Sequence, residues 1–297
     1  MSRSAPLNAY AAAIAGIAFF SVMDMVMKGL TLAIGTFATM LFRSGIGVAL
    51  AGSLFLYHRP GWPDRATLRL HVRRGTITTA MALLFFWGLA RVPMAQAVAL
   101  TFIAPLLALM LAAVLLKEPV GRRSLLGSLA AAAGVAVIFV GQAQANLGRE
   151  ALLGSAALLA SAAIYAYNIV LMRQQALAAR PVEIAFFQNI IVATLLLAAV
   201  PVMGMPPLPA GHWPALLLAA ALALGSMLLL AWAYARAGAA YLSTTEYSSF
   251  LWAIALGWLA FGERVSLFTL AGAALIVAGC IIAARATDQH VALEAEA

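Results

Sequence analysis

The chain repeats itself once, and this internal duplication constrains its fold more than any other feature. Residues 95–141 and 240–286 each contain a long apolar run, a short turn with a glutamate, and a second apolar run with spaced glycines. One gapless offset of 145 residues, the separation of Glu118 and Glu263, aligns the two copies. A half-chain duplication is typical of transporters, so we expect two units, residues 1–143 and residues 144–297. The same offset pairs Lys28 with Arg173, Phe42 with Phe187, Trp87 with Trp232, Arg91 with Arg236, Gly127 with Gly272 and Gly134 with Gly279.

The composition indicates a polytopic membrane protein. Of the 297 residues, 65% are hydrophobic and only 9% are charged, whereas soluble domains carry roughly 25% charged residues. Apolar runs of about 20 residues, enough to cross a bilayer as a helix, recur from end to end. A barrel would need short alternating segments instead, so we expect an all-α membrane protein. The predicted transmembrane helices are ten, at about 8–30, 35–57, 72–90, 94–116, 124–141, 151–173, 182–203, 212–235, 240–262 and 267–285.

The basic residues predict the orientation of the chain. If the N-terminus is cytoplasmic, thirteen lysines and arginines fall on the cytoplasmic side, and three, Arg91, Arg149 and Arg264, fall on the other. The positive-inside rule then places both the N- and C-termini in the cytoplasm. Because five helices per unit is an odd number, the second unit enters the membrane inverted relative to the first. Two inverted five-helix repeats can expose a shared site to each side in turn, which favours alternating access.

Several functions are disfavoured by what the sequence lacks. The net charge of +8 comes from basic residues scattered over short loops, with no soluble domain to present them to nucleic acid. No G-x-x-x-x-G-K-[ST] motif is present, so an ATP-driven pump would need a separate motor subunit. The four histidines show no metal-ligand spacing, and the single Cys280 allows no intrachain disulfide. We therefore expect no cofactor, no metal and no enzymatic activity. A channel would need a symmetric pore or a carbonyl filter, and neither is visible.

The segments around the two glutamates resemble the EamA-type, ten-helix branch of the drug/metabolite transporter superfamily. In the first unit the resemblance lies in APLLALMLAAVLLKEPV, which contains Pro105, and in the glycines that follow. In the second unit it lies in LWAIALGWLAFGERVSLFTLAGAALIVAG, where Gly262 and Glu263 form the family's Gly-Glu turn. Two positions depart from the family: Lys117 replaces the glycine of the first turn, and Phe250 stands where the family often has proline.

This resemblance covers nearly the whole chain and implies a transporter with a cavity near the bilayer centre. It implies that the first, third, fourth, sixth, eighth and ninth helices surround the cavity, and that the fifth and tenth lie outside. Members of the family commonly export amino acids and related metabolites, and this chain looks most like the bacterial aromatic amino acid exporters. We expect a multi-pass exporter of aromatic or neutral amino acids in the bacterial inner (plasma) membrane. The alternative is an efflux transporter for cationic or aromatic drugs.

Of the ionisable side chains inside the predicted helices, where a charge costs roughly 2.5–3.5 kcal/mol at the helix centre, four are candidates for a role in transport. Asp24 and Lys28 are one turn apart, so they either neutralise each other or act in binding and gating. Arg43 either pairs with Asp24 or Glu246 or acts in gating. Glu246 lies in the most polar stretch of any predicted helix, residues 242–249. A carboxylate there could bind a substrate ammonium, carry a proton, or hydrogen-bond to neighbouring helices.

Uncharged residues complete the predicted cavity. Phe20 and Tyr165 are equivalent in the duplication and would stack on a planar substrate, unless they are ordinary core contacts. Hydroxyls in such helices often bond to their own backbone, and tryptophans near helix ends often anchor at the interface. Pro105 should bend its helix and is a candidate hinge, and Gln96 is a candidate gate. The other predicted cavity residues are Thr79, Thr101, Asn168, Trp232 and Thr245.

Glycines recur every seven residues on one face of the fifth and tenth predicted helices, at Gly127, Gly134 and Gly141 and at Gly272 and Gly279. Small residues let helices approach closely in lipid, so we expect these faces to pack within or between protomers. The chain is therefore predicted to be a monomer or a homodimer. Its predicted partners are a small-molecule substrate and the lipid bilayer, with no nucleic acid.

Overall fold

The computed structural model describes residues 4–295 except 59–60, 105, 109, 112–121, 145–147, 237–241 and 243–244. Regular structure in this part of the chain is helical, without a strand, so the all-α prediction is confirmed. The helices are α1 (Ser4–Ile34), α2 (Thr36–His58), α3 (Arg65–Leu89), α4 (Met94–Thr101), α6 (Arg122–Gln144), α7 (Gly148–Ala178), α8 (Pro181–Met203), α9 (Trp213–Tyr234), α11 (Ser248–Phe261) and α12 (Leu267–Ala295).

The helix boundaries repeat with the spacing found in the sequence. The offset of 145 residues carries the first and last residues of α2 onto those of α8. The same offset relates α1 to α7 and α3 to α9, with small differences at their ends. Equivalent side chains also make equivalent contacts. The Arg91 guanidinium lies 3.5 Å from the centroid of the Trp87 ring, and that of Arg236 lies 4.1 Å from the centroid of Trp232. The repeat found in the sequence is therefore also a repeat of helices and contacts in the structure.

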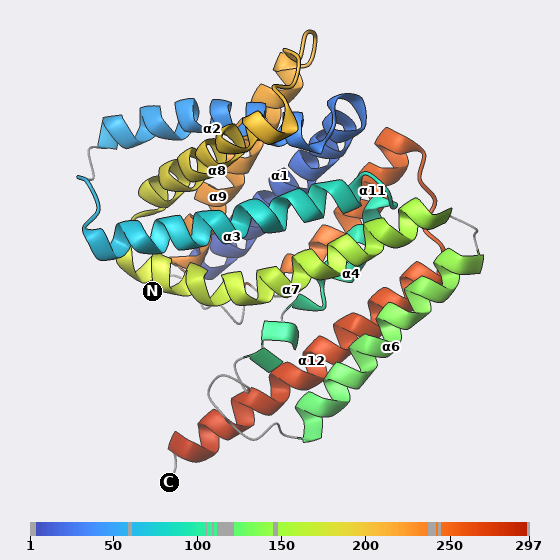
Figure 1. The fold of residues 1–297 in the computed structure, drawn as a ribbon. Helices are drawn as coiled ribbons and strands as arrows, with labels where there is room; N and C mark the ends of the chain where they lie inside the picture. Colours follow the sequence, from blue (N-terminus) through green and yellow to red (C-terminus); the bar gives the residue numbers. More distant parts are fainter. Residues whose placement is uncertain are drawn as a thin grey trace.

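The bundle has two ends, which we name the Arg91 end and the Arg236 end. α3 finishes just before Arg91, and α9 finishes just before Arg236. At the Arg91 end, Gly35 has a φ of 82°, which lets the chain turn directly from α1 into α2. Following the helices, the first unit starts at the Arg236 end and the second starts at the Arg91 end (Figure 1). The two units therefore run in opposite directions.

Six of the described helices are long and apolar enough to cross a membrane: α1, α2, α6, α7, α8 and α9. Three apolar stretches, Met94–Ala108, Ser248–Phe261 and Leu267–Ile282, are shorter. α3 belongs to neither group, because arginines occupy its first half. The predicted start of this helix at residue 72 differs from the structure, where it begins at Arg65. Ten transmembrane helices and cytoplasmic termini stay predictions.

α6 and α12 form an antiparallel pair at the edge of the bundle (Figure 1). A Cβ on Gly134 would lie 2.5 Å from the carbonyl oxygen of Gly272, and a Cβ on Gly279 would lie 2.5 Å from that of Gly127. Only glycine permits so close an approach of two backbones. The glycine faces therefore pack against each other within one chain.

The remaining helices pack in pairs that the duplication relates. α1 packs along α9, and its equivalent α7 packs along α3. The short α4 and α11 contact each other, and they also contact α7 and α1 respectively. The large, fully buried side chains of this region include Met27, Met40, Leu89 and Met94. The interior is therefore formed by α1, α3 and α4 together with α2, which the family resemblance does not place around the cavity.

Candidate transport site

A buried ion pair joins the two units at the Arg91 end. The side chain of Lys28, on α1, is 5% exposed and forms an ion pair with Glu263, which follows α11. The Lys28 ammonium also donates to the carbonyl oxygen of Val92 at 2.6 Å and lies 5.2 Å from the centroid of the Phe261 ring. The second carboxylate oxygen of Glu263 accepts the N–H of Met94, the first residue of α4, at 2.7 Å. One cation and one anion thus connect α1, α4 and α11.

The Gly-Glu turn explains how this carboxylate is placed. α11 ends at Gly262, whose φ of 66° is the left-handed conformation that glycine adopts readily after a helix. The N–H of Glu263 then bonds back to the carbonyl oxygen of Gly257 at 3.1 Å. A Cβ on Gly257 would lie 2.7 Å from Oε2 of Glu263, so this glycine leaves room for the carboxylate. The carboxylate caps the start of α4, where free N–H groups favour a negative charge.

Asp24 is not the partner of Lys28, so of the two alternatives left open by the sequence, mutual neutralisation does not hold in this structure. Asp24 is 5% exposed, and the charge of Arg43 on α2 acts on it. No ion pair joins these two described residues, and Oδ1 of Asp24 and Nε of Arg43 lack hydrogen-bond partners within the described part. A buried polar atom without a partner costs about 1–3 kcal/mol. Such groups therefore need an explanation, and a role in transport is the candidate one.

The carboxylate of Glu246 has a hydroxyl partner and acts on the neighbouring phenol groups. Tyr234, the last residue of α9, donates its hydroxyl to Oε1 of Glu246 at 3.2 Å. The charge of Glu246 acts on the phenol groups of Tyr165 and Tyr247. Tyr247 packs edge-on against Phe102, which follows α4, with the centroids 5.7 Å apart. Glu246 itself is exposed. The result is an accessible carboxylate among three tyrosines.

Arg74 of α3 adds a cation to this group of residues. Its charge acts on the Tyr165 phenol, and the charge of Glu246 acts on the same phenol. The Arg74 guanidinium donates to the side-chain oxygen of Gln175, and its Nε has no hydrogen-bond partner among the described residues. Sequence reasoning missed Arg74, because it was counted only among the basic residues that set the orientation. An anion and a cation from different units thus act on Tyr165.

A second buried cluster, at the Arg236 end, was also missed. Nε2 of His71 on α3 lies 3.0 Å from Oε1 of Glu183 on α8, and Nδ1 lies 2.5 Å from Nε2 of Gln175 on α7. The His71 ring stacks on Phe187 at 4.7 Å, and His71 is 1% exposed. His71 was expected at a helix end, but α3 starts earlier and carries it inside. The signal for His71 in the sequence was its position between Arg69 and Arg73, directly before an apolar run.

The three predicted threonines turn their hydroxyls toward their own backbone. Thr79 bonds to the carbonyl oxygen of Gly75 at 2.8 Å, and Thr101 bonds to that of Val98 at 2.8 Å. Thr245 bonds to the carbonyl oxygen of Leu242, three residues earlier, at 2.6 Å. Their donors are therefore occupied, although each hydroxyl oxygen can still accept a hydrogen bond.

Phe20 and Tyr165, the aromatic residues at equivalent positions, make no ring contact with each other among the described residues. Phe20 is 48% exposed. Trp232 is 40% exposed, and the guanidinium of Arg236 lies 4.1 Å from the centroid of its ring. Stacking of Phe20 and Tyr165 on a planar substrate stays a prediction.

The remaining predicted residues divide between buried contacts and the undescribed part. Asn168 is 1% exposed, and its amide oxygen lies 3.5 Å from the hydroxyl of Thr78. Gln96 of α4 is buried and donates to the hydroxyl of Ser155 on α7 at 3.1 Å. Gln96 therefore links the two units near the Arg91 end. Pro105, the predicted hinge, lies outside the described residues.

A multi-pass helical protein that consists of two oppositely directed units, with ionisable groups buried between them, has the architecture of a membrane transporter. The model of the EamA-like transporter family matches residues 7–140 and again residues 152–285. The chain therefore belongs to this family, which is part of the drug/metabolite transporter superfamily.

Individual relatives are more distant. The chain is similar to the "Pseudopaline exporter CntI" of Pseudomonas aeruginosa strains UCBPP-PA14 and PAO1. Each is 26% identical over 272 residues, which cover 90% of this chain and 92% of the relative. A solved crystal structure superposes with a TM-score of 0.59 at 22% identity, covering 95% of this chain and 98% of that one. This likeness supports the fold alone.

Proposed function

We propose that this chain is a secondary transporter that exports aromatic or neutral amino acids and related metabolites. The observation that carries the proposal is that a carboxylate of one unit, Glu246, and a guanidinium of the other, Arg74, both act on the phenol of Tyr165. An amino acid carries both charges, an ammonium and a carboxylate. The likeness to the pseudopaline exporters supports export, rather than uptake, of a small molecule.

Each part of the site has a role in this proposal. The Glu246 carboxylate binds the substrate ammonium, and the unpartnered Nε of Arg74 donates to the substrate carboxylate. The rings of Tyr165 and Tyr247 provide faces for an aromatic or aliphatic side chain. Charge-assisted hydrogen bonds at both ends of the substrate fix its orientation. Glu246 also supplies the proton-binding group if export is coupled to proton entry.

The Lys28–Glu263 pair supports alternating access. It ties the first unit to the second at the Arg91 end. Glu246 is exposed and precedes α11, whereas Glu263 follows it, so Glu246 lies nearer the Arg236 end. We propose that both termini are cytoplasmic in a bacterial inner membrane, so that this conformation is closed to the outside. Opening then requires Lys28 and Glu263 to separate while the units rock about the central site. Monomeric and dimeric forms both fit this mechanism.

The alternative function is efflux of cationic or aromatic drugs. A cationic drug without a carboxylate uses Glu246 and the tyrosines, and it gains nothing from Arg74. The two functions therefore make different predictions for Arg74, although they share Glu246. The next experiment uses this difference.

Counterflow into proteoliposomes, with a panel of amino acids and cationic dyes, tests the proposal. Glu246→Gln should reduce amino acid counterflow by about tenfold or more, because a charge-assisted hydrogen bond becomes a neutral one. Arg74→Gln should reduce it similarly and leave the dyes unaffected. Glu150→Gln, which changes an exposed glutamate paired with Arg91, is the control. Amino acid transport that survives Glu246→Gln would contradict the site, and dye transport without amino acid transport would support the alternative.

A further inference from the structure

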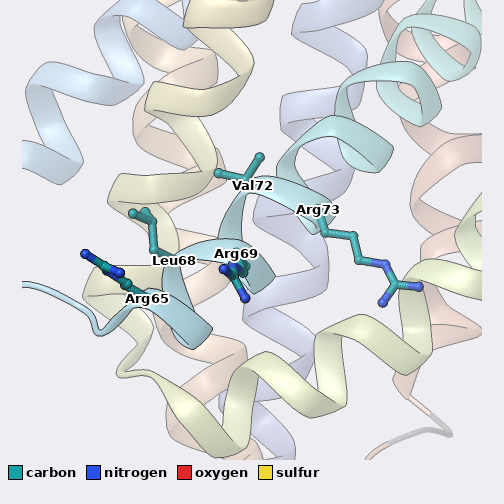
Figure 2. Close-up of a pocket in the computed structure, with 5 residues that line it drawn as sticks. All are labelled: Arg65, Leu68, Arg69, Val72 and Arg73. Atoms are coloured by element: carbon teal, nitrogen blue, oxygen red, sulfur yellow. The ribbon is translucent and has the colours of Figure 1, made fainter.

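An open groove of about 400 Å³ lies along one side of α3 at the Arg236 end. Its lining residues are Arg65, Leu68, Arg69, Val72 and Arg73, and Figure 2 shows all five side chains on this helix. The arginines are spaced by four residues, so they follow one side of the helix. Leu68 and Val72 are 40% and 47% exposed and lie between them. The groove therefore combines positive charge with an apolar floor.

The arginines of α3 differ in their partners according to depth. Arg73 donates to the hydroxyl of Tyr167 on α7 and lies 5.3 Å from the centroid of its ring. Arg74, one residue further along, is held by Gln175. Arg65 and Arg69 are exposed and have no hydrogen-bond or ion-pair partner among the described residues. The two deeper arginines are thus held by uncharged side chains of the protein, whereas no such partner of the two outer ones is described.

The acidic groups near the groove do not supply the missing partner. Asp64 precedes α3 and accepts the N–H of Thr67 at 2.8 Å as the helix N-cap. This hydrogen bond lowers the pKa of Asp64, which keeps the carboxylate charged but engaged. Glu183 lies on the buried side of α3, against His71. The guanidinium groups of Arg65 and Arg69 are therefore available to an anion from outside the described part of the chain.

The depth of Arg65 and Arg69 in the membrane indicates which class of anion they meet. A hydrocarbon layer about 30 Å thick takes about 20 helical residues. Counted back from the end of α3 at Leu89, that distance reaches about residue 69. Arg65 and Arg69 therefore lie near the level of the lipid headgroups, and Leu68 and Val72 lie where the headgroups meet the acyl chains. Trp62, just before α3, is 79% exposed, as is usual for a tryptophan at a membrane interface.

We propose that this groove binds an anionic phospholipid of the leaflet at the Arg236 end. Its phosphate is held by Arg65 and Arg69, and the first part of an acyl chain lies on Leu68 and Val72. Guanidinium groups suit phosphate, because they present several donors in one plane. The bound lipid then fixes the level of α3 in the membrane. This inference is independent of the substrate of the transporter.

The test is native mass spectrometry of the full chain in detergent, titrated with phosphatidylglycerol or phosphatidylcholine. The double variant Arg65→Gln/Arg69→Gln should lower phosphatidylglycerol binding by about fivefold for each arginine removed. Phosphatidylcholine binding should not change. Arg264→Gln, which removes an exposed arginine at the Arg91 end, is the matched control and should bind like the unmodified chain.

Three outcomes would overturn the proposal. The first is unchanged phosphatidylglycerol binding in the double variant, and the second is an equal loss in Arg264→Gln. The third is displacement of the lipid by glycerol phosphate at equal concentration, which would mean a site for a soluble phosphate. If the double variant does not fold, the single variant Arg69→Gln gives the same test, with about a fivefold loss expected.

Discussion

The ammonium of Lys28 has lost most of its water, and a buried ion is stable only while its partners remain. Its neighbours are the Glu263 carboxylate and the carbonyl oxygen of Val92. The carboxylate in turn has the N–H of Met94 as a second partner. Removal of one charge therefore leaves the other buried and incompletely compensated. Removal of both charges leaves no uncompensated charge in the interior.

We predict that Lys28→Met lowers the free energy of unfolding by about 3–5 kcal/mol. The double variant Lys28→Met/Glu263→Gln should be more stable than the single one, because no uncompensated charge is left. Thermal unfolding in detergent measures both changes.

The exposed pair Arg91–Glu150 is the matched control. Its nitrogen-to-oxygen distance is 2.8 Å, but its side chains are 28% and 69% exposed. The corresponding substitutions there should cost about 0–1 kcal/mol. If the single and double variants gave the same interaction energy for both pairs, burial would not be what sets the strength of the Lys28–Glu263 pair.

At the scale of elements, the α6–α12 pair depends on backbones that touch. Gly134 and Gly272 lie opposite each other, and each would direct a Cβ at the carbonyl oxygen of the other. In lipid, where apolar side chains gain little by leaving the solvent, such close packing is the main attraction between helices. A single added methyl group must therefore push the helices apart.

We predict that Gly134→Ala destabilises the protein by about 1–3 kcal/mol, the usual effect of overpacking. Gly29→Ala is the control, because a Cβ there meets no atom within 4 Å. Alanine at this position in α1 should be neutral or stabilising by up to about 1 kcal/mol, since glycine disfavours helix. If thermal unfolding shows equal losses for both variants, close packing is not what Gly134 provides.

At the scale of the whole molecule, the two units run in opposite directions through the bundle. Equivalent residues therefore lie at opposite ends, as Arg91 and Arg236 do after α3 and α9. This arrangement lets two conformations related by the duplication exchange the side to which a central site opens.

We predict that cysteines at positions 91 and 236 react with a membrane-impermeant reagent from opposite sides of the membrane. The measurement uses intact cells and inverted vesicles, in a chain whose native Cys280 is replaced by alanine. With cytoplasmic termini, position 91 should be labelled from outside and position 236 from inside. Labelling of both positions from one side would rule out the inverted arrangement.

Much of the fold was predictable because the membrane restricts what a sequence can do. The α2 and α8 helices were expected at residues 35–57 and 182–203, close to their observed bounds. The start of α3 was misplaced, because its arginines resemble a loop. In the structure, they extend the helix beyond the apolar run, and the polar side chains of Tyr167 and Gln175 accommodate two of them.

The site was less predictable than the fold. Asp24, Glu246 and Tyr165 stand out as polar or aromatic residues in apolar helices, and the charge of Glu246 acts on the Tyr165 phenol. The role of Arg74 did not stand out, because an arginine near a helix end is ordinary. Its position beside Tyr165 depends on how α3 packs along α7. The pairing of Glu263 with Lys28 was hidden as well, because it depends on how α11 packs against α1.

The sequence alone determined the helical class, the duplication and the family, because burying a backbone in lipid requires long apolar helices and the two copies still share one spacing. Tertiary structure decided which charges meet. Lys28 and Glu263 are 235 residues apart, and His71 and Glu183 are 112 apart. Their pairing follows from the way the inverted units pack, because in a medium of low dielectric each buried charge is stable only beside a partner that the packing supplies.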